Sequence, residues 1–286
     1  MNAPILVVGA SGNLGGAAAR SLLASGQEVR VSGTNPARLS EEFPGAETVR
    51  LDLHDPATFA PALAGAKGLF LIRPPRIARV GPTLNALVTS AARSGVAHIV
   101  FASVTGADTN RIVPHHRVET HLRGAGVPWT ILRPGFFAQN LADAYREDIR
   151  DHDRIVLPAG HGRAAFVDTR DVGDVAATVF AGPEKHNGRG YTLTGPEALD
   201  FDTVAALLTE ALGRRIRYQP AGVTGYLRHL RRAGVGWPRA LVQTILHTGL
   251  RDGQGEGVDP ALPGLLGRPA TTLAQYVHDH RRLWTR

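Results

Sequence analysis

The sequence predicts an α/β fold in which a doubly wound, parallel Rossmann sheet is followed by a smaller C-terminal α/β lobe. Three observations predict it. Short apolar or β-branched runs alternate with segments of helical period along the first half of the chain. A glycine-spaced loop follows the first run. Several helical segments end in glycine, which favours the left-handed conformation of a helix C-cap.

Six runs are typical of strands, and four segments between them are typical of helices. The predicted strands are Ile5–Val8, Glu28–Ser32, Thr48–Leu51, Gly68–Ile72, His98–Ala102 and Trp129–Leu132. The predicted helices are Leu14–Ala24, Ala57–Leu63, Thr83–Arg93 and Val118–Ala125. This βαβ rhythm indicates parallel strands, because a helix is the usual crossover between them.

Beyond Arg133 the rhythm changes. We predict helices for FFAQNLADAYREDIRD, RDVGDVAATVFA and DFDTVAALLTEALG, and strands for AAFVDT, GRGYTLTG and RRIRYQP, with mostly helix afterwards. No sharp linker separates the two parts. We therefore expect a first domain at residues 1–155 and a smaller, partly interwoven lobe at residues 156–286.

Composition excludes several functional classes. The chain has no cysteine, which excludes disulfides, thiolate nucleophiles and zinc–thiolate sites. No apolar run approaches the roughly 18 residues that cross a bilayer. The first strand-like run begins close to the first residue, which leaves no room for a signal peptide. We expect a cytoplasmic protein with no membrane partner.

The net charge of +7 comes from the C-terminal quarter of the chain. Residues 1–212 carry a net charge of −1, and residues 213–286 carry +8. The densest basic stretch is GYLRHLRRAGVGWPRALVQ, which alternates Arg with Leu and lacks the interleaved aromatic residues of a single-strand binding surface. A solvated helix face, or an attraction for anionic ligands, explains it better than nucleic-acid binding.

The loop GASGNLG follows the first strand and opens onto a helix, the context in which such glycines indicate a dinucleotide site. Gly9 permits the tight turn, Gly12 lets the pyrophosphate approach the backbone, and Gly15 lets the helix pack close to the sheet. The helix start offers free N–H groups to phosphates. The predicted phosphate-binding residues are Gly9, Ser11, Gly12, Asn13 and Leu14. The alternative is a glycine-rich turn without a ligand.

The spacing Gly-x-x-Gly-x-x-Gly resembles that of the short-chain dehydrogenase superfamily and its atypical branches. Further stretches resemble the NmrA-like family of NAD(P)-binding proteins, with its quinone-reductase, azoreductase and ergot-alkaloid-reductase-like members. They are GVPWTILRPGFFAQN, AFVDTRDVGDVAA and YTLTGPEALDFDTVAALLTEALGRRIRY. The resemblance covers nearly the whole chain. It implies that the first domain binds NAD(P) and that the second lobe binds substrate.

The end of the second strand discriminates between NAD and NADP, because an acid there accepts the ribose hydroxyls and a base pairs with the 2′-phosphate. The sequence VRVSGTNPARL contains no acid, which favours NADP(H) and leaves NAD(H) possible. Arg38 is the candidate phosphate partner or, equally, a solvated helix residue. Ser32, Thr34 and Asn35 could donate hydrogen bonds. Relatives that prefer NADP often have an arginine at the position of Thr34.

The remaining cofactor contacts are implied by the resemblance. It places the adenine at Asp52 and Leu53, although Asp52 could instead cap a helix near Pro56. It places a cofactor ribose near Arg73, whose side chain would reach phosphate, substrate or only solvent. The nicotinamide is expected near Pro134.

Ordinary members of the superfamily transfer protons with a tyrosine and a lysine four residues later. The chain has only Lys67 and Lys185, and neither follows a tyrosine by four. Counting back from Glu119, which matches the family's glutamate, puts Arg111 at the tyrosine position and His115 at the lysine position. The usual proton-transfer pair is therefore predicted to be absent.

His115 and Ser103 are the remaining catalytic candidates. An imidazole titrates near neutral pH, so His115 could bond the ribose or donate to substrate, unless it is a cap or surface histidine. Ser103 stands where the superfamily has its active-site serine and could orient a substrate carbonyl, unless it is only a strand-end hydroxyl. The neighbouring His116, Glu119 and His121 show no ligand motif, so we predict no metal site.

Three functions fit these residues. The first is an NAD(P)H-dependent oxidoreductase that passes hydride to a small or medium hydrophobic, conjugated acceptor such as a quinone, iminium ion or enone. Phe136 and Phe137 would then wall the pocket, unless they pack in the core. The alternatives are an NAD(P)-sensing regulator without turnover, and a biosynthetic cyclase, isomerase or dehydratase. The expected partner is a small-molecule substrate, and a homo-oligomer is possible.

Overall fold

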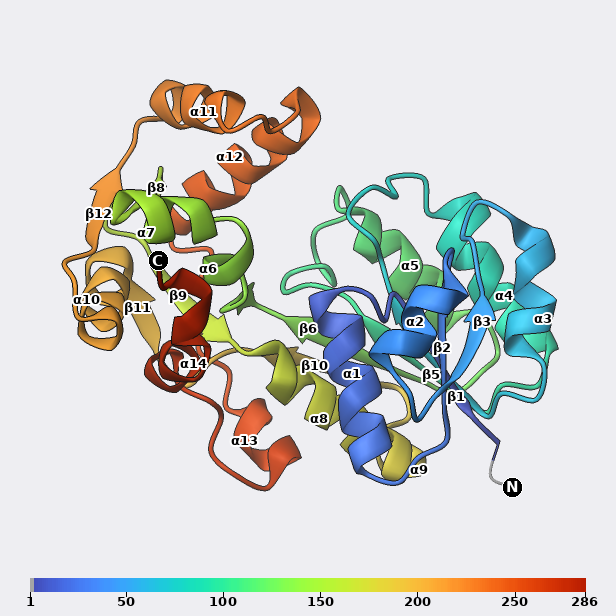
Figure 1. The fold of residues 1–286 in the computed structure, drawn as a ribbon. Helices are drawn as coiled ribbons and strands as arrows, with labels where there is room; N and C mark the ends of the chain where they lie inside the picture. The colour runs from blue at the N-terminus through green and yellow to red at the C-terminus, as the bar shows by residue number, and fades with distance from the viewer. Residues whose placement is uncertain (1–2) are drawn as a thin grey trace. The chain divides into compact units, whose positions relative to one another are not determined.

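The computed structural model describes residues 3–286, which divide into two compact units (Figure 1). Unit 1 comprises the chain up to Pro134 together with Thr169–Leu193 and Ala261–Arg268. Unit 2 comprises Gly135–Asp168, Thr194–Pro260 and Pro269–Arg286. The chain thus crosses between the units several times. It first leaves unit 1 after Pro134, whereas the sequence places the boundary at residue 155.

Unit 1 is a seven-stranded parallel sheet flanked by helices, with strand order β10-β6-β5-β4-β1-β2-β3. Its strands are β1 (Ile5–Val8), β2 (Val29–Gly33), β3 (Glu47–Arg50), β4 (Gly68–Ile72), β5 (His98–Ala102), β6 (Trp129–Pro134) and β10 (Arg189–Leu193). Its helices are α1 (Asn13–Ala24), α2 (Pro36–Glu42), α3 (Phe59–Leu63), α4 (Ala86–Arg93), α5 (Pro114–Arg123), α8 (Thr169–Ala181), α9 (Pro183–His186) and α13 (Ala261–Leu266), with single turns at Pro56–Thr58 and Gly81–Asn85. The predicted doubly wound fold is confirmed.

The direction of winding reverses between β1 and β4. From β1 the chain proceeds to β2 and β3 on one side, and then returns to β4, β5 and β6 on the other. In open parallel sheets, ligands bind at the carboxyl ends of the strands beside such a switch point. The residues of β1 and β5, and all but the last residue of β4, are buried, as expected for a parallel sheet covered on both faces.

Unit 2 has two small sheets and its own apolar core. The strands are β7 (Phe136–Phe137), β8 (Arg154–Leu157), β9 (Arg163–Val167), β11 (Ala198–Asp200) and β12 (Arg217–Pro220), in the orders β11-β9-β7 and β12-β8. The helices are α6 (Asn140–Asp143), α7 (Arg146–His152), α10 (Phe201–Leu212), α11 (Val223–Arg232), α12 (Trp237–Arg251) and α14 (Leu273–His280), followed by a turn at Arg281–Trp284. Within residues 3–286, no helix has the length and apolar character needed to cross a bilayer.

The prediction of one helix over FFAQNLADAYREDIRD is wrong. Phe136 and Phe137 form β7 and pair with Phe166 and Val167 of β9, and two short helices follow. The backbone N–H of Ala138 also donates to the Val167 carbonyl at 3.0 Å. Pairing with a strand distant in sequence therefore overrides the local helical period.

Candidate functional site

The candidate cofactor residues follow the carboxyl ends of six parallel strands of unit 1. They are Gly9 to Leu14 after β1, Thr34 to Arg38 after β2, Asp52 and Leu53 after β3, Arg73 after β4, Ser103 after β5, and Pro134 at the end of β6. Because the strands are parallel, all of these residues lie along one edge of the sheet. That edge contains the switch point between β1 and β4.

The loop after β1 forms a backbone cradle that only glycine can build. Gly9 has a φ of +74°, and a Cβ at this position would lie 2.4 Å from Ile72 Cδ1. A Cβ at Gly15 would lie 2.2 Å from the Gly9 carbonyl oxygen. Helix α1 begins without a side-chain cap and without an acid in its first turn. Ser11, Gly12 and Asn13 are exposed there, and Leu14 is half-buried. This positive, accessible helix end fits a pyrophosphate.

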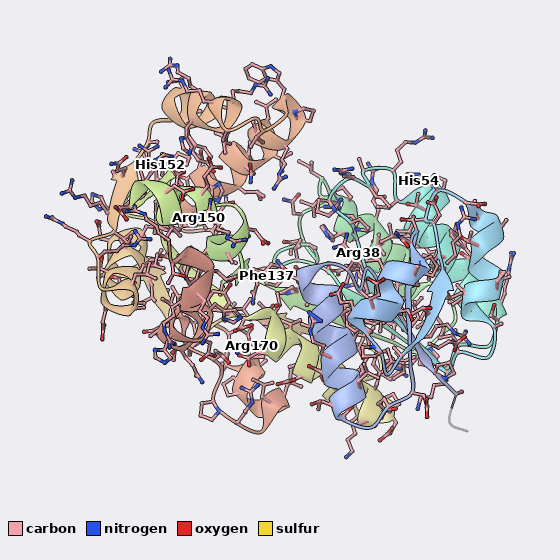
Figure 2. The ribbon with its side chains drawn as sticks, in the orientation of Figure 1. Arg38, His54, Phe137, Arg150, His152 and Arg170 are labelled. Atoms are coloured by element: carbon pink, nitrogen blue, oxygen red, sulfur yellow. The ribbon has the colours of Figure 1, made fainter. Side chains whose placement is uncertain are left out.

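The loop after β2 leaves one cation accessible. Asn35 caps α2, since its Oδ1 accepts from the Arg38 backbone N–H at 3.3 Å. Thr34 is exposed, and so is the Arg38 guanidinium, for which no partner is found among residues 3–286 (Figure 2). Ser32 is buried and donates to the Val7 carbonyl at 3.0 Å. The expectation that Ser32 donates a hydrogen bond to the cofactor is therefore corrected, because its hydroxyl already donates to a backbone carbonyl of β1.

Asp52 and Leu53 follow β3, and Leu53 is buried. Asp52 Oδ1 accepts from the backbone N–H of His54 at 2.9 Å. The cap of the turn at Pro56–Thr58 is Asp55, which accepts from the Ala57 backbone N–H at 3.2 Å. The helix-cap alternative for Asp52 is thus wrong, and its second carboxylate oxygen is left without a hydrogen bond within the described chain.

Arg73 follows β4 and connects its own loop to α5. Its Nε donates to His115 Nε2 at 3.1 Å, and its Nη1 donates to the carbonyls of Ile77 at 2.7 Å and Pro74 at 3.2 Å. The alternative of a merely solvated side chain is therefore excluded. Among residues 3–286 no partner is found for Nη2, which leaves that nitrogen for a phosphate or a substrate.

The contact with Arg73 fixes the protonation of His115. A guanidinium only donates hydrogen bonds, so His115 Nε2 accepts and the ring proton lies on Nδ1. Burial, together with the charge of Arg73, lowers the pKa of His115 to about 4, against an opposing effect of Glu119. His115 is thus neutral at pH 7. The expectation that it titrates near neutral pH is corrected, because desolvation and a neighbouring cation both disfavour the imidazolium.

Ser103 belongs to a buried cluster around Glu119. Ser103 Oγ donates to Glu119 Oε1 at 2.6 Å, and Arg133 donates from Nε to Oε1 at 3.0 Å and from Nη2 to Oε2 at 2.8 Å. Burial alone would raise the pKa of Glu119, but these hydrogen bonds lower it below its ordinary value. Glu119 is therefore ionised, and it accepts the one hydrogen bond that the Ser103 hydroxyl can donate. The expectation that Ser103 orients a substrate carbonyl is corrected, because the hydroxyl has no proton left to donate.

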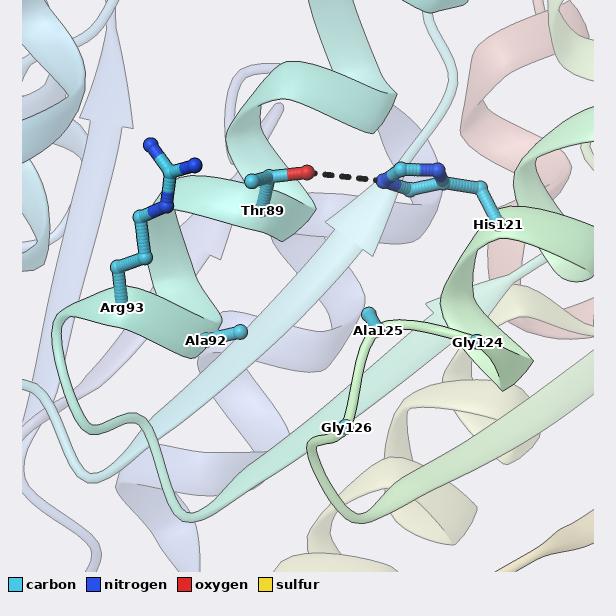
Figure 3. A pocket seen from close by; sticks show the side chains of 7 residues that line it. All are labelled: Thr89, Ala92, Arg93, His121, Gly124, Ala125 and Gly126. Carbon is cyan, nitrogen blue, oxygen red and sulfur yellow. Dashed lines mark hydrogen bonds between the residues drawn. The ribbon is translucent and has the colours of Figure 1, made fainter.

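The other two histidines of α5 point to separate partners. His116 Nδ1 bonds the Ala107 carbonyl at 2.8 Å. His121 Nε2 bonds the Thr89 hydroxyl at 2.9 Å, in a surface hollow of about 390 Å³ between the ends of α4 and α5 (Figure 3). Both helices end there before the next strand begins, so this hollow lies at the sheet edge opposite the candidate cofactor residues.

The two phenylalanines differ in their surroundings within unit 2. The Phe136 ring lies edge-on to Phe166, Phe201 and His247, with centroids 5.3, 6.4 and 6.0 Å apart. Phe137, labelled in Figure 2, is half-buried, and within the described chain it has none of the ring contacts that Phe136 makes. Core packing therefore applies to Phe136, and Phe137 is the better candidate for a pocket wall.

Sequence reasoning missed two partners in this site. Arg133 ends the apolar strand TILRP, and a buried arginine nearly always pairs with an acid, so this signal pointed to a carboxylate such as Glu119. The contact between Arg73 and His115 joins residues 42 positions apart, and no local pattern indicates it.

A comparison with models of known protein families identifies the family of the chain. The model of the NmrA-like family matches residues 1–254. The chain belongs to the NmrA-like family. The resemblance found in its sequence is thereby confirmed.

This NmrA-like chain is 31% identical to an NAD(P)H azoreductase from Xenophilus azovorans, over 96% of the chain and 97% of that protein. Its structure matches an NADPH-dependent quinone oxidoreductase from Escherichia coli, solved with NADPH, with a TM-score of 0.86 and 27% identity over 96% of this chain and 99% of that one. It also matches a Citrobacter sp. triphenylmethane reductase, solved with NADP(H), with a TM-score of 0.84 and 26% identity over 96% and 99%.

Replacing Arg133 tests the buried cluster of this NmrA-like protein. Arg133→Met should lower the free energy of unfolding by about 3–5 kcal/mol, because the buried carboxylate of Glu119 loses its main partner. Urea denaturation at pH 7 measures the change. The matched control is Arg123→Met, which removes the 37% exposed partner of the same carboxylate and should cost less than about 1 kcal/mol. Equal losses would contradict the assignment.

The protonation of His115 can be observed directly by nitrogen-15 NMR of labelled histidine. We expect a neutral ring with its proton on Nδ1 from about pH 5.5 to 8, because its pKa lies near 4. Arg73→Leu should raise that pKa and release the tautomer, whereas Arg76→Leu, an exposed change on the same loop, should not. A wild-type His115 resonance that titrates near pH 6.5 would refute this description.

Proposed function

We propose that this chain passes a hydride from NADPH to a hydrophobic, conjugated acceptor of the quinone, iminium or enone type, without a protein acid. Its enzyme class, NAD(P)H-dependent oxidoreductase, is that of its azoreductase and quinone-reductase relatives. One observation carries the proposal. The proton of Ser103 is held by Glu119, and His115 is neutral, so neither candidate can supply a proton at pH 7.

The class of acceptor follows from this lack of an acid. Reduction of a simple ketone develops an alkoxide, which needs a proton donor close by. A neutral imidazole N–H bonds an oxygen but does not release its proton near pH 7. The first tyrosine of the chain is Tyr145, so the part up to Pro134 contains none. Quinones, enones and iminium ions delocalise the incoming charge or already carry a positive one, and water can protonate the product.

Different residues of unit 1 would bind the different parts of NADP(H). When bound, NADPH supplies the hydride. The glycine cradle before α1 would hold the pyrophosphate through backbone N–H groups, and Arg38 would pair with the 2′-phosphate. Asp52 would accept from the adenine amino group through its unbonded oxygen. His115 offers Nδ1–H to a ribose hydroxyl, and Phe137 would wall the acceptor site.

Calorimetry with the four nicotinamide dinucleotides, followed by turnover, tests the function. NADPH should bind tightest and should be oxidised in the steady state by quinones, iminium dyes or enones, but not by simple ketones. Tight binding without turnover on any acceptor would indicate a sensor. Product formed without net cofactor oxidation would indicate a cyclase, isomerase or dehydratase. Either result overturns the proposal.

Arg38→Gln tests the choice of cofactor. The affinity for NADPH should fall roughly tenfold to a hundredfold, because a charge-assisted hydrogen bond contributes about 1.5–3 kcal/mol. The affinity for NADH should stay the same. The control is Arg93→Gln, an exposed substitution on α4 at the opposite sheet edge, which should change neither affinity. Equal weakening of NADPH and NADH by Arg38→Gln would exclude a role at the 2′-phosphate.

A further inference from the structure

Helix α12 of unit 2 exposes a continuous apolar face. We call it the α12 face. It comprises Trp237 (57% exposed), Leu241 (48%), Val242 (56%), Ile245 (70%) and Leu246 (62%). The spacing of four residues between Trp237, Leu241 and Ile245, and between Val242 and Leu246, places them on one side of the helix. Soluble proteins rarely expose so many large apolar side chains together unless they contact something.

The opposite side of α12 is fixed in the core of unit 2. Ala240 and Thr244 are buried there. His247 is also buried, with Nδ1 bonded to the Tyr226 hydroxyl at 3.1 Å and Nε2 bonded to the Tyr145 hydroxyl. Rotating the helix to bury the α12 face would break both hydrogen bonds. Exposure of this face is therefore built into the unit.

Three arginines that have no partner within residues 3–286 lie on α12 and on the neighbouring helix α11. Residues 211–251 contain eight arginines and no aspartate or glutamate. Arg228 and Arg232 lie on the neighbouring helix α11, and Arg239 lies on α12 (Figure 1). For these three, residues 3–286 provide no hydrogen bond or ion pair. The Arg231 guanidinium lies over the Trp237 ring at 5.1 Å, which joins the charged and apolar parts of the surface.

We propose that α11 and α12 dock on the surface of a bilayer that contains anionic lipids. The α12 face would enter the boundary between headgroups and acyl chains, and the arginines would pair with lipid phosphates. Trp237 suits this boundary, because its ring is apolar and its N–H is polar. Attachment at one surface needs no spanning helix, although the sequence suggested no membrane partner.

Charge favours a bilayer with anionic lipids over a second copy of the chain as the partner of the α12 face. A second copy of the chain would bring together two pairs of α11 and α12 helices that carry arginines and no aspartate or glutamate of their own, and like charges repel. An acidic protein would neutralise the arginines. A chain that binds such a protein and no lipid would stay in solution with both kinds of vesicle, which the experiment below detects.

Sedimentation of the full-length protein with vesicles tests the proposal. We expect it to pellet with vesicles of phosphatidylglycerol and phosphatidylcholine, and to stay in solution with phosphatidylcholine alone. Ile245→Ser combined with Leu246→Ser should weaken binding at least about tenfold, because two large apolar side chains are lost. Arg228→Gln combined with Arg232→Gln should weaken it by a similar factor. Circular dichroism and Tm confirm that each variant is folded.

Two pairs of control substitutions test whether vesicle binding depends on α11 and α12 and not on any exposed arginine or apolar side chain. Arg215→Gln with Arg217→Gln removes the same charge from exposed positions outside α11 and α12, and should weaken binding much less. Ile112→Ser with Val258→Ser removes two other exposed apolar side chains and should leave binding unchanged. Vesicle binding is measured without turnover, so that result is independent of the proposed reductase activity.

Three outcomes would overturn the proposal. The wild-type protein could stay in solution with both kinds of vesicle. Sedimentation velocity could show a dimer that Ile245→Ser with Leu246→Ser dissociates, while vesicles are ignored, which would assign the face to a second copy. The same double variant could raise KM for a water-soluble acceptor without changing vesicle binding, which would assign the face to the acceptor.

Discussion

The buried carboxylate of Glu119 determines how the candidate site of unit 1 is arranged. It receives hydrogen bonds from Ser103, beyond the end of β5, and from Arg133 in β6, while Arg123 reaches it from the next turn of α5. A buried charge is tolerated only when such donors surround it. The carboxylate therefore locks α5 to the carboxyl ends of two strands, and His115, one turn earlier on the same helix, is placed with it.

This arrangement decides which protons are available. Ser103 donates its only proton to Glu119, and His115 accepts from Arg73 at Nε2, so these stabilising hydrogen bonds occupy the Ser103 proton and keep the His115 ring neutral. A lysine at the position of His115 would carry a positive charge and three donors, whereas the neutral imidazole offers one N–H. In the proposed reaction, the same contacts that hold the site together would therefore favour acceptors that need no protein acid.

The sequence was sufficient for the parts of the structure that local patterns encode. Strands such as Gly68–Ile72 and the glycines around Gly9 are specified by periodicity and backbone conformation, and the predicted sheet is present. The prediction of a helix at Phe136 and Phe137 was wrong, because these residues form a strand whose partners in β9 lie far along the chain. The tautomer of His115 was equally inaccessible, since it depends on one contact with Arg73.

The proposed hydride transfer concerns unit 1 and the proposed bilayer docking concerns unit 2. The chemistry of the acceptor connects them. Among the proposed acceptors, quinones and enones without charged groups are apolar, so they partition from water into lipid. A chain attached to a bilayer through α12 would encounter such molecules at a far higher concentration than in solution. Attachment of this kind needs reversible, moderate affinity, which a partly exposed apolar face with a few arginines provides and a spanning helix does not. The absence of carboxylates across residues 211–251 then has a physical reason, because an acid beside the α12 face would repel the anionic headgroups that the arginines attract.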